Sequence, residues 1–498
     1  MSINIAVIGA GFSGIAAATC LADQGHKVTI YEKNDSPGGR ARKFSQDGFT
    51  FDMGPSWYWM PDVFEKYFAR FDKKVGDYYD LERLDPSYRV FFGQDDLVDV
   101  PADLEDFYQL LEDLEPGSKD KLKQFLKESE NKYDAGMNDL VYSPGNSPLE
   151  FINKKTITGF LKLDLLKPIS SYLRKYFSHP KILQLLEFPV LFLGAMPENT
   201  PALYSMMNYA DIVLGTWYPK GGMHKIIEGM VTLAKEKGVE FVYNAAVEQL
   251  NIENRKAYSI EINNQEHKFD AIISSADYHH VEQQLIPKAN RKYDEKYWQG
   301  RKMAPSCLLY YIGVNKQLKE LQHHNLFFDT DFKKHAEEIY KNPEWPENPL
   351  FYVCCPSKTD DTVAPEGCEN LFILIPTAPG LIETEETKEK YLDMVIKRLE
   401  KLTGQSIASN IVLNKSYGAS NFMSDYNAFK GNAYGLANTL DQTAFLKPSI
   451  RNKKITNLYN TGQLTVPGPG VPPSLISGQI AANELIKDLK NNRYESTV

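Results

Sequence analysis

Long hydrophobic runs are missing from this sequence of 498 residues. No apolar stretch reaches 18 residues, the length from which a membrane-spanning helix is expected. The most apolar part, residues 182–196, is interrupted by Gln184, Glu187 and Pro189. The apolar N-terminus also lacks the basic residues with which a signal peptide begins. We therefore expect neither a transmembrane helix nor a secretion signal.

Two further features are absent: a disulfide framework and an excess of positive charge. The cysteines are five in number and irregularly spaced, at Cys20, Cys307, Cys354, Cys355 and Cys368. They form no C-x-x-C motif, and the adjacent pair is no plausible structural bridge, which predicts free thiols in a reducing cytoplasm. The net charge of −9 argues against nucleic acid as a partner.

Motifs for metal binding and for nucleophilic catalysis are also absent. The paired histidines His279-His280 and His323-His324 lack the spacing of metal ligands. Because we expect adjacent side chains to point apart, we predict no metal site. No Ser/His/Asp set can be assembled from the sequence order, so the catalytic residues stay unassigned.

Aromatic residues, in contrast, are abundant. The chain holds 29 Tyr and 26 Phe, and 42% of its residues are apolar, enough for a large core. The length indicates two or three domains. The aromatic share suggests an aromatic-lined cavity, although burial in the core alone would also explain it.

The first residues form the most informative motif. Residues 3–8 are an apolar run of strand length, followed directly by Gly9-Ala10-Gly11-Phe12-Ser13-Gly14 and by an apolar helix-like stretch. In such a unit Gly9 permits the tight turn, Gly11 lets the backbone approach a pyrophosphate, and Gly14 brings helix and strand together. The free N–H groups at the helix start would face the phosphates. Ordinary βαβ packing is the alternative.

A second predicted strand, residues 27–31, ends on Glu32. This acid is placed to accept hydrogen bonds from a ribose 2′-hydroxyl. An acid rather than an arginine argues against a 2′-phosphate, so the motif favours FAD or NAD over NADP.

Residues 34–42 decide between those two cofactors. They hold a second glycine-rich turn, Gly38-Gly39-Arg40, which a nicotinamide enzyme does not need. A flavoprotein of the glutathione-reductase type does, since the chain passes an extended dinucleotide twice. Gly38 and Gly39 would allow close approach, and Arg40 would supply charge to the phosphates. A surface turn with solvated arginines is the alternative, and we predict FAD.

Two later segments complete the predicted cofactor site. An alternating strand, residues 49–52, leads into the turn Gly54-Pro55-Ser56, which would lie along a flavin ring unless it is only a packed hairpin. Near the C-terminus a strand, a stiff Pro-Gly loop and a helix over residues 475–489 follow one another. A helix N-terminus there is suited to the electron-rich end of a reduced flavin.

Residues 151–181 differ from the rest of the chain in charge. They carry seven Lys and Arg residues against one Asp, with aromatic and aliphatic residues between them. A basic amphipathic segment of this kind can lie in a bilayer interface. A solvated helix over the core is the alternative.

The order of these segments predicts an α/β fold whose Rossmann-like FAD-binding domain, of glutathione-reductase type, is discontinuous. We assign it residues 1–71, 215–290 and 431–498, because a buried strand near residue 272 looks like a return to the nucleotide sheet. A β meander should begin at residue 241. Residues 72–214 and 291–430 would form a mixed α+β substrate domain, whose first part contacts the membrane.

Together these motifs resemble those of the bacterial-type phytoene desaturases, within the flavoprotein family of amine oxidases and carotenoid desaturases. The resemblance covers essentially the whole chain. Its C-terminal block G-x-x-T-x-P-G-x-G is matched from Gly462 to Gly470, while Asn460 and Gln463 depart from the usual pattern. It also implies that Val247 lies against the adenine half of FAD. The predicted cofactor-binding residues are Gly9, Gly11, Ser13, Gly14, Glu32, Lys33, Gly38, Gly39, Arg40, Gly54, Pro55, Ser56, Val247, Gly462, Gly470 and Val471.

The resemblance implies an FAD-dependent oxidoreductase that desaturates a hydrophobic carotenoid, with phytoene as the expected substrate and conjugated products such as lycopene. We expect a quinone or oxygen as electron acceptor. The free thiols and the basic segment predict a cytoplasmic protein bound peripherally to the inner face of the cell membrane. Three alternatives stay open. They are a later-step desaturase of a hydroxylated or conjugated carotenoid, a carotene isomerase, and a prenyl-binding escort protein like the guanine-nucleotide dissociation inhibitors.

Overall fold

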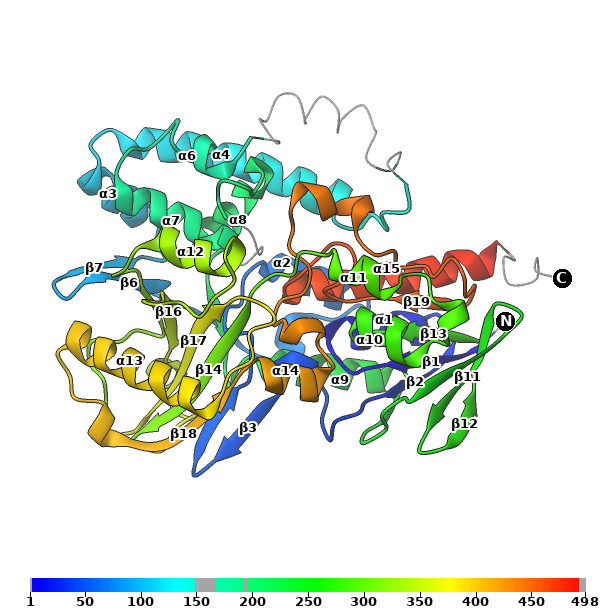
Figure 1. The fold of residues 1–498 in the computed structure, drawn as a ribbon. Helices are drawn as coiled ribbons and strands as arrows, with labels where there is room; N and C mark the ends of the chain where they lie inside the picture. Colours follow the sequence, from blue (N-terminus) through cyan, green and yellow to red (C-terminus); the bar gives the residue numbers. More distant parts are fainter. Residues whose placement is uncertain (1, 148–149, 151–166, 192–195, 492–498) are drawn as a thin grey trace.

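The computed structural model describes residues 2–147, 150, 167–191 and 196–491, and it is built around two large sheets (Figure 1). A five-stranded parallel sheet lies next to the N- and C-termini. A seven-stranded, mostly antiparallel sheet lies beside it. No helix within the described ranges is long and apolar enough to cross a bilayer.

The parallel sheet draws its strands from three distant parts of the chain. In spatial order they are β19 (Leu458–Asn460), β13 (Ala271–Ser274), β1 (Asn4–Ile8), β2 (Lys27–Tyr31) and β9 (Glu240–Val242). All four pairings are parallel, and β1 is the central strand between β13 and β2. The carboxyl ends of these strands therefore meet at one edge, where such sheets bind their ligands.

Strand β1 is buried on both faces, which explains its continuous apolar sequence. Ile5 and Val7 belong to the main hydrophobic core beneath α1 (Phe12–Asp23), α9 (His224–Glu236) and α15 (Val471–Lys490). Ala6 and Ile8 pack on the opposite face, against the core of the small sheet β10–β12. That sheet consists of β10 (Gln249–Glu253), β11 (Lys256–Ile262) and β12 (Gln265–Lys268).

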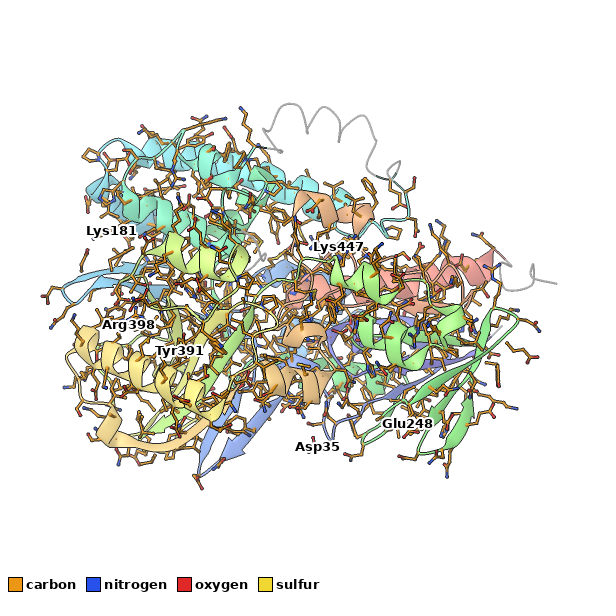
Figure 2. The ribbon with its side chains drawn as sticks, in the orientation of Figure 1. Asp35, Lys181, Glu248, Tyr391, Arg398 and Lys447 are labelled. Atoms are coloured by element: carbon orange, nitrogen blue, oxygen red, sulfur yellow. The ribbon has the colours of Figure 1, made fainter. Side chains whose placement is uncertain are left out.

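The larger sheet forms the body of the second domain. Its strands are, in spatial order, β18 (Ile411–Tyr417), β14 (Ser306–Val314), β17 (Glu369–Thr377), β16 (Phe351–Cys354), β15 (His324–Phe327), β6 (Tyr88–Gly93) and β7 (Asp96–Val100). On β14, Leu308, Tyr310 and Ile312 pack under α13 (Glu385–Thr403). Figure 2 marks Tyr391 and Arg398 on this helix, and the Arg398 guanidinium lies 4.9 Å from the ring centroid of Phe351. Cys307, Leu309 and Tyr311 face the other way, into the main core.

Helices cover that second face of the sheet. In Figure 1 the cyan-to-green helices form a layer above it. Its longer helices are α3 (Leu104–Leu114), α4 (Ser118–Ala135), α7 (Pro180–Leu191) and α12 (Phe332–Tyr340), with the short α6 (Ile169–Leu173) and α8 (Met206–Asn208). The remaining elements are the hairpin β3 (Lys43–Gln46) and β4 (Phe49–Asp52), the pair β5 (Leu81–Arg83) and β8 (Trp217–Pro219), and α2 (Pro61–Ala69), α10 (Tyr278–His280), α11 (Glu295–Gln299) and α14 (Ala419–Tyr426).

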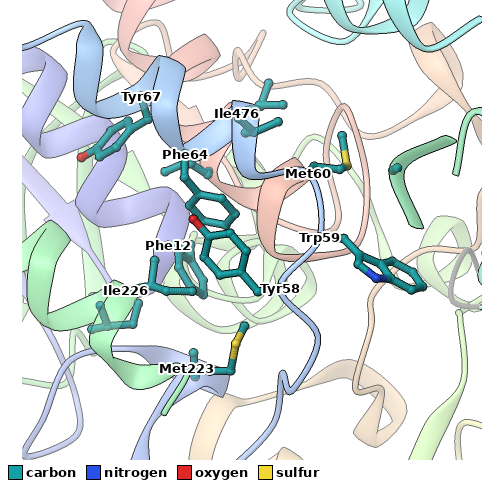
Figure 3. Packing of buried hydrophobic residues seen from close by; sticks show 14 of the residues in the cluster. Phe12, Tyr58, Trp59, Met60, Phe64, Tyr67, Met223, Ile226 and Ile476 are labelled. Carbon is teal, nitrogen blue, oxygen red and sulfur yellow. The ribbon is translucent and has the colours of Figure 1, made fainter. Parts of the chain in front are cut away.

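An aromatic segment, residues 53–64, joins the two domains. Figure 3 shows Tyr58 beside Phe64 in the core, with their rings stacked at a centroid distance of 4.6 Å. Trp59 points away from this pair, and it lines the large cavity described below. The hydroxyl of Tyr311 on β14 donates to the carbonyl of Met53 at 2.7 Å, which ties the sheet to this segment.

The architecture confirms the predicted α/β fold class with a discontinuous Rossmann-like domain and a mixed second domain. The residue boundaries of the domains stay predictions. Two details of the sequence prediction are wrong. Residues 240–242 do not begin a meander but pair with β2 at the edge of the parallel sheet. The last helix begins at Val471 rather than at residue 475, because Pro472 and Pro473 fit a first helical turn, where a missing N–H costs nothing.

Most of the basic segment, residues 151–166, lies outside the described residues. Within its described remainder, Arg174 pairs with Glu187 at 2.7 Å, and Lys181 pairs with Asp96. These two charges are therefore balanced by acidic neighbours.

Candidate functional site

The turn after β1 opens toward a large cavity. Gly9 has a φ of +98°, a conformation that favours glycine, and its N–H donates to the carbonyl of Tyr31 at 2.8 Å. Gly11 then caps α1 without any side-chain hydrogen bond to the helix. The first amide groups of α1 lack partners within the helix, so they remain available to an anion.

Gly11 and Gly14 have different roles in this turn. A Cβ built on Gly11 would meet nothing closer than the Ser275 Oγ, at 3.9 Å. A Cβ on Gly14 would lie only 2.1 Å from the carbonyl oxygen of Gly9. Gly11 therefore keeps space open on the cavity side, while Gly14 allows the helix to pack on the strand.

Glu32 is buried at the end of β2 and fixes the turn. Its Oε2 accepts from the N–H of Ala10 at 2.8 Å, and its Oε1 accepts from the N–H of Asn34 at 2.9 Å. A carboxylate can accept more than these bonds, so capacity remains for a ribose hydroxyl. The neighbouring Lys33 donates from its Nζ to the carbonyl of Ser424 in α14, at 2.7 Å.

The second glycine-rich turn packs directly on the first. Gly38 has a φ of +118°, its N–H donates to the carbonyl of Ala10 at 2.8 Å, and a Cβ on Gly39 would lie 3.4 Å from the Cα of Gly11. A Cβ on Gly54 would lie 2.5 Å from the carbonyl oxygen of Arg40, so this glycine lets the turn at residues 54–56 approach.

Arg40 brings a partly buried positive charge to this junction. Its Nη2 donates to the carbonyl of Asn432 at 3.2 Å, and its guanidinium lies 5.3 Å from the ring centroid of Tyr426. Its buried Nε has no hydrogen-bond partner among the described residues. Burial lowers the pKa of Arg40, against the opposing field of Asp277. A partly buried guanidinium with a spare donor fits a phosphate ligand.

The C-terminal block closes the site from the other side. Gly462 has a φ of +105°, and a Cβ on it would lie 3.3 Å from the Ser13 Oγ. At the start of α15, Val471 has a backbone N–H, whereas Pro472 and Pro473 have none. Further along α15, a Cβ on Gly478 would lie 2.2 Å from the carbonyl oxygen of Ser13, which shows how closely α15 crosses α1.

These segments surround one cavity of about 840 Å³. All of the predicted cofactor-binding residues line it except Gly14, which packs behind the turn. The open space at Gly11, the two helix N-termini and the spare donor of Arg40 fit an extended dinucleotide. The role of each individual residue in binding stays a prediction.

The cavity continues toward the seven-stranded sheet, where its wall becomes apolar. Aliphatic and aromatic side chains line this part, including Leu309, Leu326, Phe328, Ile339, Phe372 and Leu374. Among the lining residues from 305 to 376, a range that the structure describes in full, there is no Asp, Glu, Lys or Arg. The one histidine of this wall, His335, has both ring nitrogens paired, with the carbonyl of Pro376 and the N–H of Leu350. Burial lowers its pKa to about 4, so the ring is neutral at pH 7.

Several lining residues were missed by the sequence analysis. Ser275 is one of them, and its hydroxyl oxygen lies 2.8 Å from that of Ser13, which was predicted; Asp277, two residues further on, is another. Burial raises the pKa of Asp277, while Arg40 opposes that shift. The small residues at 274–276, at the end of a buried strand, were the available signal. Asp425 and Tyr426 of α14 also line the cavity, and no motif marks them.

The expectation that adjacent histidine side chains point apart is wrong for His323 and His324. Their ring centroids lie 4.5 Å apart, and both rings are buried. One possible ligand atom from each lies within 4.8 Å of the other and of the Cys354 thiol. No local pattern in the sequence marks this arrangement, because Cys354 comes from the neighbouring strand.

Comparisons with known proteins agree with this geometry. The family model described as "Flavin containing amine oxidoreductase" matches residues 12–486. A carotenoid 3,4-desaturase of Haloarcula japonica is 42% identical over 488 residues, which cover 98% of each chain. A 4,4′-diapophytoene desaturase (4,4′-diaponeurosporene-forming) of Staphylococcus aureus is 34% identical over 502 residues, covering 98% of this chain and 99% of the relative.

The fold is also found in solved structures. An oxidoreductase from Methanosarcina mazei superimposes with a TM-score of 0.63 at 16% identity, covering 96% of this chain and 99% of that one. The sequence match along nearly the whole chain and the glycine-rich turns around the cavity lead to one conclusion: the chain belongs to the flavin containing amine oxidoreductase family, and its cofactor is FAD.

Proposed function

We propose that this oxidoreductase desaturates a carotenoid with FAD as the electron acceptor. The observation that carries the proposal is the wall of the cavity beyond the cofactor cradle, where residues 305–376 contribute no charged side chain. Such a wall suits a long hydrocarbon, because it buries apolar surface without leaving a charge unpaired. The names of the two curated relatives support the same substrate class.

Different residues of this chain would bind the cofactor and the substrate. The turns at Gly11 and Gly39, the partly buried Arg40 and the start of α15 would hold the pyrophosphate and the flavin end of FAD. When bound, FAD supplies an acceptor for the hydride removed from one carbon, while the neighbouring carbon loses a proton. The apolar wall would orient the polyene and exclude water. No side chain is assigned as the base.

The substrate within this class has two candidates. Phytoene is the substrate predicted from the sequence resemblance. A later-step carotenoid, already hydroxylated or conjugated, is the second candidate, and the 42% identity to a 3,4-desaturase favours it.

Anaerobic flavin reduction would separate the candidates. Purified protein with bound FAD would be mixed with phytoene in liposomes, and in parallel with a hydroxylated carotenoid, while the oxidised flavin absorption is followed. Bleaching by phytoene and a product with extended conjugation would support the first candidate. Bleaching by the hydroxylated carotenoid alone would support the second, and bleaching by neither would contradict desaturation.

The same preparation tests the remaining alternatives. An isomerase would act only with flavin reduced beforehand and would return a product of unchanged mass. A prenyl-binding escort protein would bind prenylated partners without any change in flavin absorption. Reoxidation of the bleached enzyme by oxygen or by a quinone would identify the electron acceptor, which we propose to be one of these two.

We further propose that the protein binds the membrane peripherally, at the cytoplasmic face, through the basic segment at residues 151–181. A carotenoid dissolves in the bilayer, so an enzyme that uses it gains from binding there. Co-sedimentation with anionic and with neutral liposomes would test this, and equal binding to both would contradict a role for the basic residues.

A further inference from the structure

Three potential metal ligands meet at one edge of the cavity wall, outside the cofactor site. In the antiparallel pair β15–β16, His324 lies directly opposite Cys354, and His323 is the residue before β15. One ligand atom from each residue lies within 4.8 Å of the other two. The three residues are 4%, 0% and 2% exposed for His323, His324 and Cys354, so the cluster is closed to bulk water.

Each imidazole is held by one nitrogen and leaves the other unused. The Nδ1 of His323 lies 2.8 Å from the Thr359 Oγ1, and the Nδ1 of His324 lies 2.6 Å from the Tyr352 hydroxyl. Both Nε2 atoms are buried without a hydrogen-bond partner among the residues that the structure describes. In metal sites one ring nitrogen binds the ion, while the other is fixed by an outer hydrogen bond. The two histidines have this arrangement.

The surroundings leave room for a small occupant. A cavity of about 20 Å³ is lined by two of the three residues, His323 and Cys354, together with Ser56 and Asp52. This volume is enough for one water molecule or one ion. The Asp52 carboxylate accepts from the backbone N–H groups of Met223 and His224, so an acidic group is also fixed at this cavity.

We propose that His323, His324 and Cys354 bind one d¹⁰ transition-metal ion, Zn²⁺ or Cu⁺. Two imidazoles and a thiolate match the ligand preference of both ions, whereas Mg²⁺ and Ca²⁺ prefer oxygen ligands. On binding, the Cys354 thiol loses its proton to solvent and a metal–sulfur bond forms, while both imidazoles bind in the neutral form. No electron is transferred in this step.

The ion would stabilise the wall of the substrate cavity. His324 stacks on Trp57, with ring centroids 4.0 Å apart and an interplanar angle of 15°, and Trp57 lines the large cavity. The ligands belong to β15, β16 and the residue that precedes β15, so the ion would lock these strands together and hold the imidazole on which Trp57 rests. The role is structural, and it does not depend on which substrate the enzyme uses.

The test is the metal content of the full-length protein with its FAD, purified from cells grown with added zinc and copper. Elemental analysis should give one ion per chain and identify it as zinc or copper. Cys354→Ser should lower the content at least tenfold. Cys355→Ser is the matched control, because this adjacent buried thiol lies near Ser357 and Glu369 instead and should keep the ion.

Two further measurements keep the proposal testable if Cys354→Ser misfolds. X-ray absorption at the metal edge of the wild-type protein should show one sulfur and two imidazole nitrogen neighbours. Thr359→Val, which removes only the partner of His323, should weaken zinc affinity about 10- to 100-fold in competition with a chromophoric chelator. Absence of metal, metal without a sulfur neighbour, or equal content in the wild type and a folded Cys354→Ser variant would overturn the proposal.

Discussion

Gly11→Val should abolish FAD binding while leaving the fold intact. Gly11 has a φ of −82° and a ψ of 179°, an extended conformation that valine adopts without strain. Its Cβ would point into free space, with the nearest atom 3.9 Å away. Loss of the flexible glycine from the unfolded chain should stabilise the cofactor-free protein slightly, by about 0.4–1 kcal/mol. The branched side chain would instead occupy the space that the pyrophosphate needs.

Gly14→Ala, three residues further along, should have the opposite effect. Its Cβ would lie 2.1 Å from the Gly9 carbonyl oxygen, so helix α1 would have to move away from the strand. Overpacking of this kind destabilises a core by about 1–3 kcal/mol. The loss should appear in the cofactor-free protein as well as in the FAD complex.

The assay combines the flavin-to-protein absorbance ratio with urea unfolding in the absence and presence of FAD. A ligand at 100 times its dissociation constant stabilises the native state by about 2.7 kcal/mol, and the Gly11→Val variant should lack this gain. Stoichiometric FAD in Gly11→Val, or an unchanged free energy of unfolding in cofactor-free Gly14→Ala, would refute the distinct roles assigned to the two glycines.

Three other predictions address separate parts of the chain. Glu32→Ala should lower FAD occupancy and destabilise the protein by about 1–3 kcal/mol, because the buried Ala10 N–H loses its acceptor; flavin titration and urea unfolding measure both effects. Burial lowers the pKa of Lys447 (marked in Figure 2) from 10.5 to about 7, so native stability falls as the pH drops from about 10 toward 7. Lys447→Met should therefore raise the free energy of unfolding at pH 7 by a few kcal/mol, and a gain that is equally large at pH 10 would contradict this cause. Replacing four lysines of the basic segment by Glu should release the protein from anionic liposomes at low salt, because each basic charge contributes roughly 1 kcal/mol to membrane binding. The lysines are Lys154, Lys155, Lys162 and Lys167. Unchanged co-sedimentation would argue against membrane binding through this segment.

The N-terminal part of the cofactor site could be predicted from the sequence because its residues lie close together in the chain. Gly9, Gly11 and Glu32 lie within one βαβ unit, where spacing alone determines which groups meet. The C-terminal block was recognised as a motif, although its helix begins four residues earlier than expected. The prolines at the second and third helical positions were assigned to the stiff loop, whereas proline is compatible with a helix start.

The substrate domain could not be derived in the same way. Strand β14 pairs with β17 and β18, which follow it by roughly 60 and 100 residues, and β15 pairs in parallel with β6, which precedes it by more than 200. No local pattern encodes such pairings. For the same reason, the contact between His324 and Cys354 could not be predicted from the sequence. Only the register of β15 against β16 brings the two residues together.

The order of the strands in the parallel sheet has a consequence for synthesis of the protein. The edge strand β19 and helix α15 come from the last tenth of the chain, yet the N–H of Thr461 bonds to Ser274 and α15 crosses α1 at Ser13. At about 5–20 residues per second, a ribosome needs on the order of tens of seconds between making the N-terminal turn and making its last neighbours. FAD therefore has no complete binding site on the growing chain. The apolar helix α1 lacks its neighbour α15 until residues 471–490 have been made, and nascent chains that stop before residue 460 should lack bound flavin and be prone to aggregate.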